Sequence, residues 1–190
     1  METKKEQTTD IALIMSSPSL KPGKLPSKQC KTRVNELKTF CNSGVKFIEQ
    51  FNFDFCASRY REFKTQKSAL LSKKINLREV AATYNTKTPE ALLSLWLTNL
   101  CIYMDFSIMQ VQISPTAKYM VEEIGMLNMA ELTLLFHRIR EGFYGEFYGK
   151  FNPQIVLRAC REYRQERGRI ISKMNSEEQS KILNTLYEYE

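Results

Sequence analysis

Residues 75–190 are divided by a series of helix-start signals, and these signals constrain the fold more than any other feature of the sequence. Each signal is a side chain that can accept hydrogen bonds from the free N–H groups of a first helical turn. It is followed by proline at once, or by Glu or Gln three residues later. The signals are Asn76 with Glu79, Thr88-Pro89, Ser114-Pro115, Asn128 with Glu131, Asn152-Pro153 and Ser176 with Gln179. They predict helices over residues 77–84, 89–106, 115–124, 129–141 and 153–174, and a last helix that carries Ile182, Leu183 and Leu186.

The helix predicted over residues 89–106 differs from the others because it is apolar on almost all sides. Its few polar side chains, Ser94, Thr98 and Asp105, fall on one narrow stripe. An amphipathic helix covers a core from one side, whereas a helix with this pattern has to be surrounded by other elements. We therefore expect residues 89–106 at the centre of the fold.

The segment before these signals is harder to assign. The apolar residues of segment 28–40 recur at helical spacing, and Gly44 can end that helix. Aromatic and polar residues alternate over 51–55, as in a strand, but the apolar residues over 56–70 recur at helical spacing. The longer pattern favours a helix that begins near Phe47 and runs to Leu71, with a break along it allowed.

Residues 1–27 have no periodic apolar pattern, hold three of the six prolines and include a basic stretch, so we expect a flexible, disordered tail. The sequence as a whole predicts an all-α protein, with a single orthogonal bundle of seven or eight helices over residues 28–190. Within that helical domain, residues 28–74 form a basic helical subregion and residues 75–190 form the helical core.

Positive charge is concentrated in the first two-fifths of the chain. Residues 1–74 contain 15 Lys and Arg against 7 Asp and Glu, a balance of +8, whereas residues 75–190 contain 13 against 14, a balance of −1. Such asymmetry is typical of a segment that meets a polyanion, and nucleic acid is the commonest one. A basic surface that serves only solubility is the alternative, since net charge governs association rather than fold.

Cysteine and histidine are too sparse for the usual site chemistries. The 5 cysteines are odd in number and form no C-x-x-C pair, and His137 is the only histidine, so the sequence predicts neither a disulfide framework nor a metal site. Free thiols favour a reducing compartment, and we expect a cytoplasmic protein. Because no nucleophile–base or carboxylate pair stands in a known motif, we expect a non-enzymatic protein without a cofactor. The most apolar stretch, residues 92–106, is too short to cross a bilayer, and we expect no membrane partner.

The most unusual segment is residues 142–151, GFYGEFYGKF, in which glycines and aromatic residues dominate. Its rings could form a platform on which unpaired bases stack, with neighbouring cations as phosphate contacts. A tight interhelical loop is the alternative, in which Gly142 caps the preceding helix and the rings cover the end of the core. The candidate residues here are Arg138, Arg140, Phe143, Tyr144, Phe147, Tyr148 and Lys150.

A second candidate is an arginine-rich face on the helix predicted over residues 153–174. At about 100° per residue, apolar side chains such as Val156 and Tyr163 form a buried stripe and several arginines lie opposite. Exposed arginines can follow a phosphate backbone, and a solvated helix face is the alternative. Arg167 falls on the apolar stripe, where a charged side chain needs a partner or has to extend its head to water. The candidate phosphate contacts, including the basic residues of the earlier segment, are Arg158, Arg161, Arg169, Arg59, Arg61 and Lys64.

Residues 75–170 also carry a set of motifs: LREVA at residues 77–81, LLSLWLTNL at 92–100, LNMAELTLLF at 127–136, GFYGEFYGKFNP at 142–153 and YRQER at 163–167. In these motifs the chain resembles a family of uncharacterised helical proteins from Bacteroidota and from their phages and mobile elements. The resemblance implies a role in replication or in maintenance of a mobile element, as a loader or adaptor. It transfers no catalytic residue, because the family has no settled activity.

Together these patterns predict a non-enzymatic accessory protein that engages DNA or RNA, or a replication protein bound to nucleic acid. In this hypothesis the basic N-terminal segment supplies salt-dependent affinity, and the aromatic loop and arginine face supply local contacts. The alternative is a pure protein–protein adaptor or inhibitor that uses loop 142–151 without touching nucleic acid.

Overall fold

The computed structural model describes residues 28–63, 65–72, 75–107 and 110–179, with side chains for all of these except residues 28–33 and 61. The predicted tail over residues 1–27 and the predicted helix around Ile182 lie outside the described residues. The described part is all-α, as predicted, and its only extended pairing is an isolated antiparallel bridge between Asn76 and Asn128.

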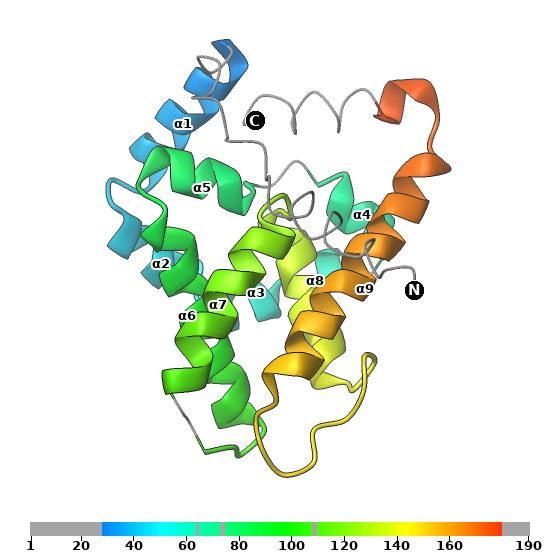
Figure 1. Ribbon diagram of the computed structural model, residues 1–190. Coiled ribbons are helices and arrows are strands. Elements are labelled where there is room, and N and C mark those ends of the chain that lie inside the picture. Colours follow the sequence, from blue (N-terminus) through cyan, green and yellow to red (C-terminus); the bar gives the residue numbers. More distant parts are fainter. Residues whose placement is uncertain (1–27, 64, 73–74, 108–109, 180–190) are drawn as a thin grey trace, which may run out of the picture.

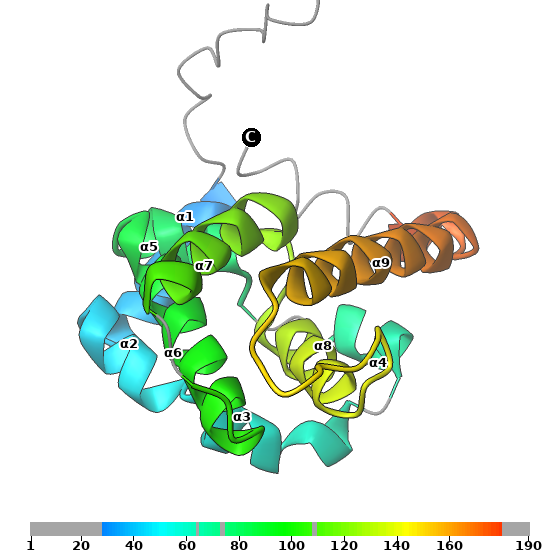
Figure 2. The ribbon, with the colours of Figure 1, turned by 60° about the horizontal axis from the view of Figure 1, so that its bottom comes forward.

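The helices follow one another through short connections and surround a central pair (Figures 1 and 2). Helix α6 contacts α2, α3, α5 and α7, while α8 contacts α3, α4, η1 and α9. Helix α7 joins the two groups because it packs against both α6 and α9. The elements are α1 (Lys28–Phe40), α2 (Gly44–Gln50), α3 (Phe53–Ser58), the 3-10 turn η1 (Tyr60–Glu62), α4 (Gln66–Leu70), α5 (Leu77–Thr83), α6 (Lys87–Tyr103), α7 (Gln110–Ile124), α8 (Met129–Arg140) and α9 (Pro153–Ser172).

Most predicted helices of the core are confirmed because their caps form. Asn76 and Asn128 accept backbone hydrogen bonds in α5 and α8, and the Glu side chains three residues later return the contact in complete capping boxes. Asn152 caps α9, with Pro153 in its first turn. The central position of α6 is also confirmed, since its side chains include the fully buried Trp96.

Three predicted boundaries are wrong because a neighbouring residue caps the helix or the helix runs through the signal. Helix α6 begins before Pro89, where the Asn85 side chain accepts from the N–H groups of Lys87 and Thr88. Helix α7 begins five residues before Pro115, which therefore lies inside it near an exposed end. The turn at residues 176–179 is capped by Asn175, whose Oδ1 accepts from Glu178 N at 2.8 Å.

The single helix expected from Phe47 to Leu71 is replaced by three short helices and a 3-10 turn, and Gly44 begins α2 rather than ending α1. Asn52 caps α3 at the first break, and Thr65 forms a capping box at the last. The breaks turn successive aromatic residues toward the core, where Phe53 packs edge-on against Trp96 and Phe136. Burial of these rings outweighs the continuity of one helix.

Segments from both halves of the chain share one core. The Trp96 indole N–H donates to the carbonyl of Phe51 at 3.0 Å, and Tyr84 Oη donates to the carbonyl of Cys41 at 2.6 Å. Gln66 Nε2 donates to the carbonyl of Tyr163, 97 positions away along the chain. The basic subregion and the helical core are therefore joined by buried and partly buried hydrogen bonds as well as by apolar packing.

Candidate partner interface

The loop between α8 and α9 combines unusual backbone conformations with a close side-chain contact. Gly142, Gly145 and Gly149 have φ values of 73°, 117° and 70°, in the region that glycine adopts at little cost. A Cβ on Gly145 would collide with the guanidinium of Arg158. The glycine-rich sequence is therefore needed for this path of the chain, most strictly at Gly145.

The rings of this loop divide between the core and the surface. Tyr144 and Phe151 are buried, and Phe147 is half-buried between Phe106 and Phe151. Phe143 and Tyr148 remain 61% and 85% exposed. Packing therefore accounts for three of the five rings, and only Phe143 and Tyr148 can offer a flat face to a partner.

Two arginines predicted as phosphate contacts are bound within the protein. Arg138 Nη1 pairs with Glu166 Oε2 at 2.7 Å and donates to Tyr144 Oη at 3.2 Å. Arg158 Nη2 donates to the Tyr144 carbonyl at 2.6 Å, and its Nε lies 3.8 Å from Glu162 Oε1. Burial raises the pKa of Tyr144, while the Arg138 hydrogen bond opposes that shift. Both arginines hold the loop against α9.

The other predicted cations lie on several sides of the bundle. Arg161 and Arg169 are exposed on α9, and Lys150 is exposed in the loop. Arg59 follows α3 and covers the Phe55 ring at 4.7 Å. Figure 2 shows α9 and α3 on opposite sides of α8, so these cations do not form one strip. Lys64 and the Arg61 side chain lie outside the described residues.

Arg140 has a different environment, between aromatic rings. Its guanidinium carbon lies 3.6 Å from the centroid of the Tyr103 ring and 5.3 Å from that of Phe53. Tyr103 ends α6, so this contact ties the end of α6 to the end of α8. The contact between Phe106 and Phe147 ties the α6–α7 connection to the loop in the same way.

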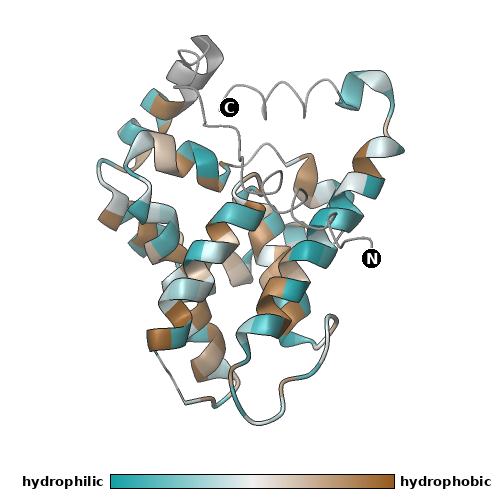
Figure 3. Ribbon diagram, viewed as in Figure 1, coloured by the Kyte–Doolittle hydropathy of each residue, from teal (hydrophilic) through white to brown (hydrophobic). Residues whose placement is uncertain are grey.

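These contacts join the end of α6 and the α6–α7 connection to the end of α8 and its following loop, at the end of the bundle that lies at the bottom of Figure 1. Five of the eight large hydrophobic side chains that are exposed in the described residues lie on the element ends that meet there. Figure 3 shows hydrophobic residues reaching the ends of α6 and α7 in this region. We call this set the apolar end surface: Ile102, Tyr103, Val111, Phe143 and Tyr148.

The α6 and α7 members of this surface were not predicted from the sequence. Ile102, Tyr103 and Val111 are 63%, 60% and 79% exposed. A signal was present, because a helix that is apolar on nearly all sides has more apolar surface than its neighbours can cover. The apolar pattern predicted central burial, which holds for most of α6 but not for its last two residues, Ile102 and Tyr103.

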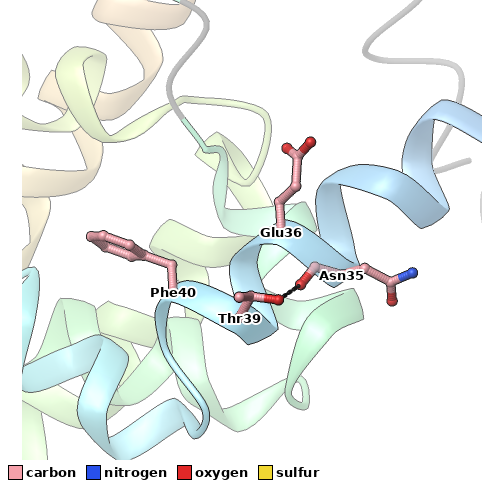
Figure 4. Close-up of a pocket in the computed structure, with 4 residues that line it drawn as sticks. All are labelled: Asn35, Glu36, Thr39 and Phe40. Carbon is pink, nitrogen blue, oxygen red and sulfur yellow. Dashed lines mark hydrogen bonds between the residues drawn. The ribbon is translucent and has the colours of Figure 1, made fainter.

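Two surface depressions lie in the described part of the protein, one beside the loop and the other on α1, away from the apolar end surface. A polar one of about 960 Å³ lies between the loop and the first turns of α9, where Tyr148, Gln154, Arg158 and Arg161 line it. A smaller one of about 590 Å³ lies on α1. Figure 4 shows that the Thr39 hydroxyl there donates to the carbonyl of Asn35, at 3.0 Å, so this side chain is already used within the helix.

Several other titratable groups of the described part are buried and make their contacts inside the protein. Of the two alternatives for Arg167, the structure shows a buried partner, since its Nε lies 2.8 Å from Glu131 Oε1. Burial raises the pKa of the Cys56 and Cys160 thiols to about 12, which suppresses the reactive thiolate. Cys41, Cys56, Cys101 and Cys160 are all free.

The described residues contain no group of three or more His, Cys, Asp or Glu that could hold a metal ion. Among the same residues, none of the helices has both the length and the apolar character needed to cross a membrane. Comparisons with protein-family models, curated proteins and solved structures found no match. The resemblance described above therefore rests on the quoted motifs alone.

Proposed function

We propose that this protein is a helical adaptor that binds a partner protein through the apolar end surface. The proposal is supported by the exposure of Ile102, Tyr103, Val111, Phe143 and Tyr148, all of which lie on element ends or loop positions at the same end of the bundle. Aromatic side chains are enriched at the energetic centres of protein interfaces, and clustered apolar side chains on a surface mark such sites. The rigid attachment of the loop by Arg138 and Arg158 presents Phe143 and Tyr148 with little loss of conformational freedom on binding.

The charges around this surface favour a protein partner over nucleic acid. Asp105 and Glu141 are exposed beside the ends of α6 and α8, so together with Arg140 and the exposed Lys150 they give this end mixed charge rather than the uniformly positive charge that a phosphate backbone favours. Arg138 and Arg158, which could have balanced them, already contact carboxylates of α9. A protein partner needs only local complementarity and tolerates this mixed charge.

Site-specific photo-crosslinking in the cell that makes the protein tests the proposal. A photoreactive phenylalanine at Tyr103 or Tyr148 should crosslink to the same partner, because both positions belong to one surface. The matched control is Tyr119 on α7, which is 56% exposed and lies outside the apolar end surface. It should not capture that partner.

The variant Val111→Asp gives the second control, because it places a charge on the surface without removing a buried side chain. It should abolish the crosslink from Tyr103 while the circular dichroism spectrum of the protein stays unchanged. Equal capture from Tyr103 and Tyr119, or capture that survives Val111→Asp, would contradict the proposal.

Nucleic-acid binding through the basic subregion is a second proposal, supported by one observation. Residues 28–74 contain 11 Lys and Arg against 4 Asp and Glu, a balance of +7. Fluorescence anisotropy with labelled single- and double-stranded DNA over a salt series tests it. Binding should weaken steeply with salt because each phosphate contact releases a counterion. Absence of binding at low salt would exclude this function.

A further inference from the structure

Arg140 differs from the other arginines of α8 and α9 that lie at helix contacts. Arg138, Arg158, Arg164 and Arg167 each face a carboxylate, at N···O distances between 2.7 and 3.8 Å. Within the part of the chain that the structure describes, the contacts of the Arg140 guanidinium are with rings: Tyr103 on one side and Phe53 further away. Its N–H groups therefore remain available for an acceptor that the described residues do not supply.

The Arg140 guanidinium carbon lies at stacking distance from the Tyr103 ring, 3.6 Å from its centroid. The N–H groups of a stacked guanidinium lie in its plane and point outward at the edge of the stack. The fork geometry of these donors matches both oxygens of a carboxylate. Because Tyr103 already holds the plane, less side-chain freedom is lost when an anion binds.

The surroundings decide which anion fits. Tyr103 is itself part of the apolar end surface, and Ile102 precedes it, so an anion at Arg140 lies next to exposed apolar side chains. A ligand that binds both the Arg140 guanidinium and these apolar side chains must carry a carboxylate close to a bulky apolar group. The exposed carboxylates of Asp105 and Glu141 flank the site in sequence and disfavour a polyanion with evenly spaced phosphates.

We infer that Arg140 is the anchor for a carboxylate on the partner, and that the partner presents a short segment in which Asp or Glu stands near a bulky apolar residue. This inference rests on the proposed adaptor function and adds the chemistry of the partner. Ile102 and Val111 contact the apolar residue, and Arg140 binds the acid in a bidentate fashion.

Selection from a displayed library of random 12-residue peptides on the immobilised full-length protein tests the inference. The wild-type protein should enrich peptides that carry Asp or Glu within four positions of Leu, Ile, Phe or Trp. The variant Arg140→Gln should bind synthetic copies of these peptides about tenfold more weakly, as expected when a charged hydrogen-bond partner is lost. Arg169→Gln, the same change on exposed α9, should bind them as the wild type does.

Tyr103→Leu provides a second variant that leaves Arg140 in place. It removes the ring on which the guanidinium stacks, so preference for acidic over amide peptides should fall while apolar preference persists. A cooperative thermal unfolding transition, measured for each variant, serves as the control that the variant is folded.

The outcomes separate the inference from the adaptor function. Enriched peptides without a carboxylate, or an acid preference that survives Arg140→Gln, would overturn the role of Arg140 and leave the adaptor function standing. If the wild-type protein enriched no peptide more strongly than the Val111→Asp variant does, both the role of Arg140 and the adaptor function would be contradicted. Displacement of the peptides by a single-stranded oligonucleotide, with the same dependence on Arg140, would overturn the inference in favour of a phosphate ligand.

Discussion

At the scale of single residues, the contact between Arg167 and Glu131 shows how a buried charge pair is tolerated. Arg167 is 7% exposed and Glu131 is fully buried, so both side chains have lost their contact with water. Glu131 uses its second oxygen to accept from Asn128 N at 3.1 Å, which makes the carboxylate both a helix cap and a counter-ion. Removal of either partner leaves the other without compensation.

The variant Arg167→Met should lower the free energy of unfolding by about 3–5 kcal/mol, because it leaves an unpaired carboxylate in the core. Urea denaturation of the wild type and the variant measures this loss. Adding Glu131→Gln to the variant should recover part of it, since the amide oxygen still accepts from Asn128. Arg169→Met, an exposed change on the same helix, should alter stability by less than about 0.5 kcal/mol. An equally small effect of Arg167→Met would contradict the role given to the pair.

The loss of stability in Arg167→Met should depend on pH. Burial raises the pKa of Glu131 and the Arg167 guanidinium lowers it, so loss of Arg167 leaves the pKa of the folded state further above that of the unfolded chain. A raised pKa means that the folded state holds a proton that the unfolded state releases, so stability is lost as the pH rises through that pKa. The deficit of Arg167→Met should therefore be smaller at about pH 5 than at about pH 8. A deficit that grows toward acid would show that Glu131 is not the group involved.

At the scale of elements, the loop between α8 and α9 depends on two glycines for different reasons. Gly145 has a φ of 117° and no space for a Cβ beside Arg158, whereas Gly149 has a φ of 70° and no atom within 4 Å of an added Cβ. The first position is restricted by conformation and by contact, the second by conformation alone. Substitutions at Gly149 and Gly145 therefore compare the effect of backbone conformation alone with the combined effect of conformation and the contact with Arg158.

Gly149→Ala should cost about 1–2 kcal/mol of stability, the usual penalty for a left-handed residue with a side chain. Gly145→Ala should cost more, because Arg158 has to leave the carbonyl of Tyr144. Amide hydrogen exchange over residues 142–152 should accelerate in Gly145→Ala and change little in Gly149→Ala. Equal exchange in the two variants would show that the Arg158 contact does not hold the loop.

At the scale of the whole molecule, local signals predicted the fold where a helix begins at a cap formed by residues that are close in sequence. The capping boxes at Asn76 and Asn128 and the start at Pro153 were readable because each involves neighbours in sequence. The segment from Phe47 to Leu71 was predicted as one helix although Asn52 and Thr65 cap its breaks locally, because its helical apolar spacing does not show that Phe53 packs against the distant Trp96 and Phe136. Ring exposure in the loop also depends on a distant residue, Phe106, so the sequence located the loop but not the surface.

The hydrogen bonds between the two halves of the chain predict that they unfold together. Trp96 is the only tryptophan, and its indole N–H donates to Phe51 in the basic subregion, so its fluorescence reports on that contact. Urea unfolding followed by tryptophan fluorescence should coincide with unfolding followed by circular dichroism at 222 nm, a wavelength sensitive to helix. A fluorescence transition at lower urea would mean that residues 28–74 detach first.

The internal pairing of arginines has a consequence for purification and for any encounter in the cell. Arg138, Arg158, Arg164 and Arg167 each face a Glu, so these pairs contribute nothing to the formal net charge of +7 and add little positive potential around α8 and α9. A cation-exchange resin would consequently bind the protein mainly through its N-terminal segment. Substitution of the lysines of that segment should reduce retention far more than substitution of the paired arginines of α9.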